Sequence, residues 1–208
     1  MMREITIPIS NEVVRSLKVG EPVGLSGVMI TARDAAHKWM VDTFIRKNRQ
    51  PEGDDLEVYE AIKSLLNGGV IYHCGPIVAG LDTGKYRFVA AGPTTSTREE
   101  PYQGEVMRHF NLKGVVGKGG MGAQTLAACK EVPGVYLHAI GGAASLIAQS
   151  VKRVLDVYKL EFGVPEAMWV IEVQNFPAVV TMDSHGESQH AVIEQKSKAI
   201  LEQLLALD

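Results

Sequence analysis

The segment GVVGKGGMGAQTLAACKEVPGVYLH, residues 114–138, decides the fold class. Its apolar runs predict short strands over residues 114–117 and 134–138, and the residues after Met121 predict a helix between them. A glycine-rich turn connects the first strand to this helix. Strands that alternate with helices in this way are typical of a parallel sheet, so the segment predicts an α/β fold.

The same alternation extends in both directions along the chain. Before the segment we expect strands over residues 23–31, 70–73 and 87–91. We also expect three helices: one over residues 34–48, one that is capped by Asp54 or Asp55 and ends at residues 67–69, and one over residues 95–110. After it we expect a helix over 144–160, strands over 169–173 and 178–182, and a last helix over 189–205. A single domain spanning residues 1–208, with two β layers and one α layer, accounts for this pattern better than two independent domains.

The last predicted helix carries an apolar stripe. Ile193, Ile200 and Leu204 recur at a spacing that places them on one side of the helix. Two interpretations stay open, because such a stripe is explained equally well by dimerisation and by packing on the domain's own core.

Composition and charge exclude several classes of protein. The chain is 46% hydrophobic and 22% charged with a formal net charge of −3, so no basic field indicates nucleic acid or an anionic membrane as partner. No apolar run is long enough to span a bilayer, and the first residues lack the apolar core of a signal peptide, so we expect a cytoplasmic protein. Cys74 and Cys129 are too few to ligate a metal alone, so we expect no metal site in this chain.

The segment GPTTSTREE, residues 92–100, begins where a strand is expected to end and a helix to start. It concentrates four hydroxyl side chains and an arginine beside the free N–H groups of a first helical turn, which bind anions readily. The alternative is a simple cap, in which Thr95 or Ser96 caps the helix and Glu99 or Glu100 complements its dipole. Because a cap needs only one hydroxyl, the excess of donors favours an anion site.

The glycine loop of residues 117–122 contains the pattern G-x-G-x-x-G. It is not a typical dinucleotide site, because the acidic residue expected about twenty positions later is absent. It is not a Walker loop either, because Gly119 rather than serine or threonine follows Lys118. What remains is a lysine on a loop with exposed backbone N–H groups, suited to an anion, or a tight turn with a solvated lysine.

A third junction between a strand and a helix lies in TARDAAHK, residues 31–38, where Arg33 and His37 are four residues apart. Taken alone, these two residues are typical of a surface arginine and a structural histidine. Together the three junctions supply Arg33, Arg98 and Lys118, which suit a dianion such as a small dicarboxylate. No strong base or metal cage accompanies them, so the chain offers half of an active site.

Two other polar segments suggest chemistry only weakly. His73 and Cys74 are adjacent on an expected strand, so they point to opposite faces and do not form a nucleophilic pair. The segment DSHG, residues 183–186, resembles part of a catalytic triad but lacks a nucleophile elbow. We interpret it as a turn before the last helix.

The segments TARDAAHK, GPTTSTR and KGGM, in this order and at this spacing, resemble the β subunit of two-subunit class I fumarases and of L(+)-tartrate dehydratases. The resemblance runs from about Thr6 to Ile193, a region that also forms the C-terminal domain of single-chain class I fumarases. It implies an α/β fold consisting of a single swivelling β/β/α domain. It also implies a hydro-lyase that dehydrates a 2-hydroxy dicarboxylate reversibly, as fumarase does with malate in the TCA cycle.

The resemblance further implies how the site is divided between two chains. A [4Fe–4S] cluster belongs to an α subunit, so this chain carries no cofactor, is inactive alone, and assembles with that partner, as α2β2. The α subunit also supplies the acid, and Thr94 is assigned as the catalytic base. The substrate-binding residues carried over by the resemblance are Arg33, Thr94, Arg98 and Lys118. The candidates for residues that support them are His37, Thr95, Ser96 and Gly119.

The substrate stays open at this stage. We expect a fumarase β subunit, acting on malate and fumarate, before a tartrate dehydratase, and mesaconate is a further candidate substrate. Glu99 stands where a methionine is common in the family, and it adds a negative charge near the anion site. A hypothesis from a different class is a stand-alone module that binds phosphate or a nucleotide through the glycine loops.

Overall fold

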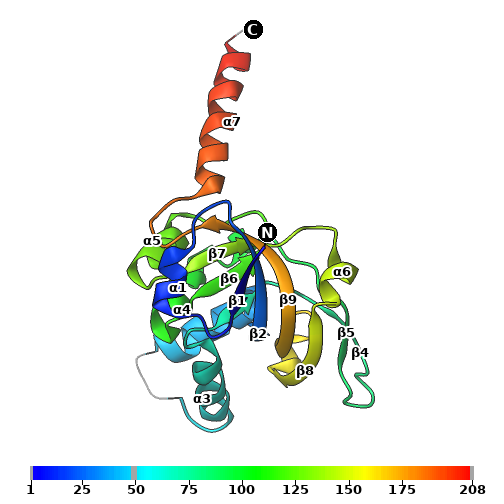
Figure 1. Ribbon diagram of the computed structural model, residues 1–208. Helices are drawn as coiled ribbons and strands as arrows, with labels where there is room; N and C mark the ends of the chain where they lie inside the picture. The colour runs from blue at the N-terminus through cyan, green and yellow to red at the C-terminus, as the bar shows by residue number, and fades with distance from the viewer. Residues whose placement is uncertain (1, 48–50, 207–208) are drawn as a thin grey trace.

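The computed structural model describes residues 2–47 and 51–206. Its strands form one mixed seven-stranded sheet and a separate two-stranded hairpin (Figure 1). The strands of the large sheet are β1 (Arg3–Thr6), β2 (Pro22–Thr31), β3 (Val70–Tyr72), β6 (Gly114–Gly117), β7 (Val135–His138), β8 (Val151–Tyr158) and β9 (Met168–Met182). The hairpin consists of β4 (Ile77–Ala79) and β5 (Arg87–Ala90).

The large sheet closes on itself because β9 pairs with three strands. It lies antiparallel to β7 and β8, and residues 170–179 also lie antiparallel to β2. The strands β2, β3, β6 and β7 pair in parallel in this order. These four strands and β9 therefore form a closed ring, which β1 and β8 extend at its sides.

Side chains on the ring alternate between two apolar cores, as the two-residue period of strands requires. On β3, Val70 and Tyr72 belong to one cluster together with Trp169 and Phe176 of β9. Ile71, between them, belongs to a second cluster formed with the helices. The first cluster fills the ring and the second joins the ring to the helical layer.

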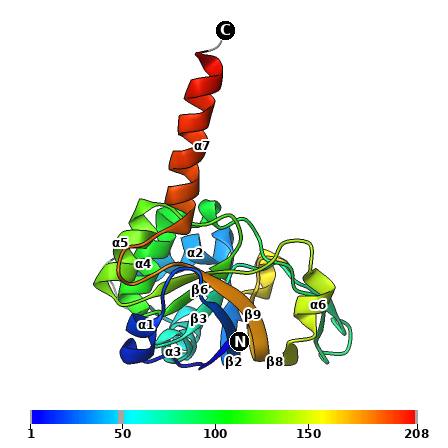
Figure 2. The same ribbon diagram turned by 45° about the horizontal axis from the view of Figure 1, so that its top comes forward.

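Apolar side chains of α2 to α5 build the second cluster, among them Met40, Leu66, Met107 and Ala128. The helices thus cover one side of the parallel strands, as Figure 2 shows. The α/β class predicted from the sequence is confirmed. The helices are α1 (Asn11–Ser16), α2 (Asp34–Met40) with a π-helical turn (Val41–Ile45), α3 (Asp54–Leu66), α4 (Glu100–Phe110) after a 3-10 turn (Ser96–Arg98), α5 (Ala123–Glu131), α6 (Ala144–Ala148), a 3-10 turn (Leu160–Phe162) and α7 (Gln189–Leu205).

The helix predicted over residues 144–160 is wrong for most of its length. Only α6 is helical, and Val151–Tyr158 forms β8 against β9. Register shifts interrupt this pairing between Val151 and Arg153 and between Val154 and Asp156. Each bulge adds a residue, so inward positions recur every third residue and imitate a helical period.

Other predicted boundaries also change. The two strands expected over 169–173 and 178–182 are one continuous strand, β9, and the sequence did not reveal β1, α1 or β4. The predicted cap at Asp54 or Asp55 is wrong, because Gly53 precedes α3 and no side chain caps it. The expected end of the helix at Asn48 lies outside the described residues.

The last helix, α7, projects from the rest of the domain in both views (Figures 1 and 2). Its Ile193, Ile200 and Leu204 side chains are 57%, 56% and 58% exposed. The interpretation that this stripe packs on the domain's own core is therefore wrong. None of the described helices combines the length and the apolar composition of a membrane span.

Truncating apolar side chains should separate the role of α7 from that of the ring. We expect Ile200→Ala to change the free energy of unfolding by less than about 0.5 kcal/mol, because the side chain is already exposed. Phe176→Ala should cost about 3–5 kcal/mol, because Phe176 is fully buried in the ring. Urea denaturation followed by circular dichroism measures both. A loss at Ile200 comparable to that at Phe176 would contradict the projecting placement of α7.

Candidate functional site

The three polar junctions identified in the sequence meet at one edge of the ring. Two of them follow β2 and β6, which flank β3 in the parallel part of the sheet, so their carboxyl ends lie together. The third, the loop of residues 92–100, follows β5 of the hairpin and reaches the ends of β3 and β6 through isolated bridges at Pro93 and Thr95. The Thr94 N–H donates to the His73 carbonyl at 2.8 Å, and the Lys118 N–H donates to the Thr94 carbonyl at 3.1 Å. The Ser96 N–H donates to the Lys118 carbonyl at 3.0 Å. Backbone hydrogen bonds therefore hold this loop between the ends of β3 and β6.

Arg33, at the start of α2, is held by an acid that the sequence analysis missed. Its Nη2 lies 3.1 Å from Glu166 Oε1, and Glu166 Oε2 accepts the Ala35 N–H at 3.3 Å. Gly75 makes room for the guanidinium, since a Cβ there would lie 2.5 Å from Arg33 Nη1. The first turn of α2 and Arg33 thus form a cradle that binds a carboxylate, here an internal one.

Arg98 is also paired with an acid, while Lys118 is not. Arg98 Nη2 donates to Asp34 Oδ2 at 2.5 Å, although the arginine side chain is 60% exposed. This contact joins the loop of residues 92–100 to the start of α2. Within the described part of the chain, Lys118 forms no salt bridge, so its charge is available to a ligand.

Several buried side-chain atoms near this edge have no partner among the described residues, and two of them are donors that belong to the junctions themselves. They are the Thr94 hydroxyl and Arg33 Nε, for which the described residues offer no acceptor. Buried polar groups are nearly always hydrogen-bonded, so unpaired ones at one place indicate a ligand position. Both donors suit a ligand that presents oxygen atoms.

A buried glutamine links two histidines beneath these junctions. Gln103 Oε1 of α4 lies 2.9 Å from Nε2 of both His37 and His73. His37 Nδ1 lies 2.9 Å from the Arg33 carbonyl oxygen, so His37 helps to fix the backbone of Arg33. Burial lowers the pKa of both histidines, and that of His73 falls well below its usual value. They are therefore neutral. Because a neutral imidazole carries one N–H, His37 donates to the Arg33 carbonyl only if the Gln103 amide is turned so that its NH2 group, rather than Oε1, faces His37 Nε2.

The network continues through Ser96 to β7. His73 Nδ1 lies 2.8 Å from Ser96 Oγ, which also accepts from the Tyr136 hydroxyl at 2.9 Å. Gly117 leaves the space for this serine, since a Cβ there would lie 1.9 Å from Ser96 Oγ. The interpretation that Thr95 or Ser96 caps the helix is wrong, because neither side chain makes a cap hydrogen bond and Ser96 joins the network instead.

The glycine loop turns away from the ring through two residues with positive φ. Gly119 has φ 81° and Gly120 has φ 84°, conformations that favour glycine. Gly119 is exposed beside Thr95, which is exposed as well. A Cβ on Gly120 would lie 2.4 Å from the ring of His190, so this glycine permits the close approach of α7.

Glu100 fills the anion site that the glycine loop suggested in the sequence. Glu100 Oε2 accepts the Gly122 N–H at 2.8 Å and the Thr125 hydroxyl at 2.7 Å. Glu100 Oε1 accepts the N–H groups of Gln124 at 2.9 Å and Thr125 at 3.3 Å. The glutamate complements the dipole of α5 rather than that of its own helix, and it leaves no room for a phosphate there.

Glu99, which the sequence analysis expected to add a negative charge near the anion site, is a buried residue. It is 1% exposed, and its Oε2 has no hydrogen-bond partner among the described residues. Burial, reinforced by the neighbouring charge of Asp34, raises the pKa of Glu99 to about 7. Near neutral pH the group is therefore only partly charged, which corrects the expectation of a full negative charge beside the anion site.

The cysteines do not fit an iron–sulfur cluster. Cys74 lies inside the ring and Cys129 lies in the helical layer, and both are fully buried. Burial raises the pKa of each thiol to about 12, which disfavours the thiolate that a metal requires. Within residues 2–47 and 51–206, no group of three or more His, Cys, Asp or Glu side chains could hold a metal ion.

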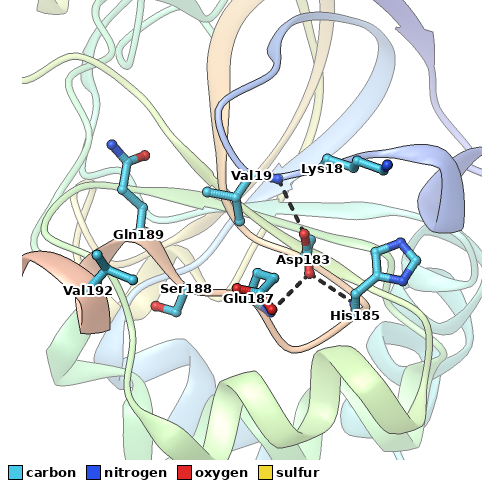
Figure 3. Close-up of a pocket in the computed structure, with 8 residues that line it drawn as sticks. All are labelled: Lys18, Val19, Asp183, His185, Glu187, Ser188, Gln189 and Val192. Atoms are coloured by element: carbon cyan, nitrogen blue, oxygen red, sulfur yellow. Dashed lines mark hydrogen bonds between the residues drawn. The ribbon is translucent and has the colours of Figure 1, made fainter.

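A cavity of about 440 Å³ at the base of α7 is separate from these junctions (Figure 3). Its buried acid, Asp183, accepts the N–H groups of Val19, His185 and Glu187 at 3.2, 2.9 and 3.1 Å. The carboxylate therefore shapes a turn, which confirms the turn predicted over residues 183–186. None of the residues that approach the end of β3 lines this cavity.

Fold and motifs together define a member of the fumarase C-terminus family. The family model matches residues 2–193, and the chain belongs to this family. It is 49% identical over 203 residues to a putative fumarate hydratase class I of Geobacillus stearothermophilus, covering 97% of this chain but only 36% of that protein. It is 40% identical to a putative L(+)-tartrate dehydratase subunit beta of Methanocaldococcus jannaschii, covering 93% and 94% of the two chains. It is 34% identical to the L(+)-tartrate dehydratase subunit beta of Escherichia coli K12, covering 90% and 86%.

Removing the Glu100 carboxylate should weaken the junction between α4 and α5. We expect Glu100→Ala to lower the free energy of unfolding by about 1–2 kcal/mol, because the first turn of α5 loses its only side-chain acceptor among the described residues. Urea denaturation measures the change. Glu57→Ala, at an exposed position of α3, is the matched control and should have little effect. Equal stabilities of the two variants would show that Glu100 does not cap α5.

Proposed function

We propose that this chain is the β-type subunit or domain of an iron–sulfur hydro-lyase and binds a small 2-hydroxy dicarboxylate, with malate and fumarate as the expected pair. The observation that carries the proposal is the convergence of Arg33, Arg98 and Lys118 at one edge of the ring. The names of the relatives, fumarate hydratase class I and L(+)-tartrate dehydratase subunit beta, support it.

The carboxylates of the substrate would bind to cations that are already oriented. Arg33 and Arg98 are held by Glu166 and Asp34, so little side-chain entropy is lost when a ligand arrives. Each charge-assisted hydrogen bond contributes about 1.5–3 kcal/mol. Lys118 adds a charge that no acid in the described residues neutralises, which leaves the junctions attractive to a dianion.

Thr94 would lie beside the carbon that loses its proton. A neutral hydroxyl is a very weak base, so Thr94 needs a nearby positive charge to stabilise its alkoxide form. Lys118 is the candidate, because its backbone is hydrogen-bonded to that of Thr94. Thr94 Oγ1 is buried and has no protein partner, as a group that contacts the substrate would be before binding.

The rest of the active site would come from a partner. The cysteines of this chain do not fit a cluster, so an α subunit, in an α2β2 assembly, would hold the [4Fe–4S] group and the acid. When bound in the partner, the cluster would supply a Lewis-acidic iron for the substrate hydroxyl. The residues of this chain would bind and orient the carboxylates.

Of the two alternative functions, one is compatible with the arrangement of the site and the other is not. Tartrate dehydration would use the same cations, because tartrate and malate share two carboxylates, and two of the relatives described above are named as tartrate dehydratase subunits. A stand-alone phosphate or nucleotide module is disfavoured, because Glu100 occupies the first turn of α5. The hydro-lyase is therefore the better proposal.

Reconstitution tests the proposal directly. We expect the purified chain to be inactive on malate, fumarate, L(+)-tartrate and mesaconate, and to gain activity when combined under anaerobic conditions with a cluster-bearing partner. Ultraviolet absorbance follows formation of the double bond from malate or tartrate and its loss from fumarate or mesaconate, and comparison of the four acids identifies the substrate. Full turnover by the chain alone, without iron, would contradict the proposed division of the site.

The role of Arg98 can be tested by a conservative change in the reconstituted enzyme. We expect Arg98→Lys to lower kcat/KM roughly 10- to 100-fold, because lysine cannot provide the planar, bidentate contact of a guanidinium. Arg46→Lys is the matched control, since Arg46 forms an exposed ion pair with Glu105. Steady-state kinetics give kcat/KM for both variants. Equal losses of kcat/KM in the two variants would count against a role of Arg98 in binding.

A further inference from the structure

Glu99 is a buried carboxyl group in the middle of a charged site. Its Oε2 lies 3.9 Å from His73 Nδ1, too far for a hydrogen bond. The charged and titratable groups that act on it come from four neighbouring elements. They are Arg33 and Asp34 at the start of α2, His73 after β3, Arg98 in the preceding turn, and Tyr136 of β7.

None of these groups serves as a direct counter-ion. Arg33 is turned toward Glu166, and Arg98 is turned toward Asp34. Burial keeps His73 neutral by lowering its pKa, and its Nδ1 is already bonded to Ser96. A buried carboxylate that lacks a counter-ion and whose Oε2 has no hydrogen-bond partner is unfavourable, whereas a protonated carboxyl group is tolerated. Glu99 therefore exchanges a proton near neutral pH.

We propose that Glu99 takes up a proton when a small dicarboxylate binds at Arg33 and Arg98, an inference that rests on the proposed function. The ligand brings two negative charges to the arginines whose field now partly stabilises ionised Glu99. Its own charges repel the Glu99 carboxylate in a buried site, where such interactions are strong. Both effects favour the protonated form, so ligand and proton bind cooperatively.

The pH dependence of ligand binding follows from the protonation equilibrium of Glu99. In the free protein the pKa of Glu99 is about 7, so the carboxyl group is about half protonated at pH 7. Binding should then take up about half a proton at pH 7, and more as the pH rises. Above pH 7, affinity should fall by up to about tenfold per pH unit, because each binding event must first protonate Glu99.

Calorimetry on the reconstituted complex tests the inference. Succinate is the probe, because it carries two carboxylates but no hydroxyl group to eliminate. Titrations at pH 7, 7.5 and 8 in two buffers of different ionisation enthalpy give the number of protons taken up. We expect uptake in the wild type and its loss in Glu99→Gln, whose affinity should change little over this range. Glu57→Gln, an exposed substitution on α3, should behave as the wild type.

The outcomes distinguish the two proposals. Equal proton uptake in the wild type and in Glu99→Gln would overturn the role of Glu99. Succinate binding without uptake would also overturn it, while leaving the proposed dicarboxylate site intact. Absence of succinate binding at every pH would contradict the proposed function itself, and the inference with it.

A measurement without ligand shows whether Glu99 is the group that titrates. Its pKa is raised from 4.5 to about 7 on folding, so its protonated form stabilises the fold at low pH and this contribution is lost as pH rises through 7. Urea denaturation between pH 5 and pH 8 should therefore show the wild type losing stability relative to Glu99→Gln. Glu99→Met, which also lacks the charge, should show the same pH dependence of stability as Glu99→Gln. Agreement of the two variants excludes the explanation that one of them is poorly folded. A difference in stability between the wild type and Glu99→Gln that stays constant with pH would overturn the inference.

Discussion

A buried chain of hydrogen bonds holds the candidate site together. It runs from the Arg33 carbonyl through His37, Gln103, His73 and Ser96 to Tyr136. Its members come from α2, the residue after β3, α4, the turn before α4, and β7, so it joins the junctions that carry Arg33 and Arg98. The junction that carries Lys118 is attached to it by the hydrogen bond from the Ser96 N–H to the Lys118 carbonyl. In a low-dielectric interior the loss of one partner leaves others unpaired, which is costly. The network therefore fixes the relative positions of the junctions more strictly than apolar packing alone would.

Electrostatic balance explains how a chain of net charge −3 can present an anion site. The positive groups are gathered at one edge, and two of them are oriented by acids from elsewhere in the chain. Glu166 and Asp34 limit the repulsion between Arg33 and Arg98, and in the proposed function the charge of Lys118 would leave a net attraction for a dianion. Such an arrangement favours a preorganised site over a flexible one.

Elements that depend on neighbouring residues could be predicted from the sequence, whereas contacts between residues far apart in the sequence could not. The strand–turn–helix pattern of residues 114–131 and the cations at the three junctions could be identified from short segments. Gln103 and His37 are 66 residues apart, so no spacing could reveal their contact. The same holds for Glu166 at Arg33, and for Glu100 at α5, which resembled an acid serving its own helix. In β8 the bulges changed the period itself, so the correct pattern gave the wrong element.

In the proposed function, the division of labour within the site also explains why relatives with this fold carry two different names. Fumarate hydratase and tartrate dehydratase act on substrates that share two carboxylates. In this proposal Arg33, Arg98 and Lys118 bind the carboxylates, so they would suit both substrates equally and contribute little to the choice between them. The substrates differ at the carbons between the carboxylates. In the proposed function, selection then depends on the groups that would face these carbons, namely the Thr94 hydroxyl of this chain and the side chains that a partner would bring to the same edge of the ring.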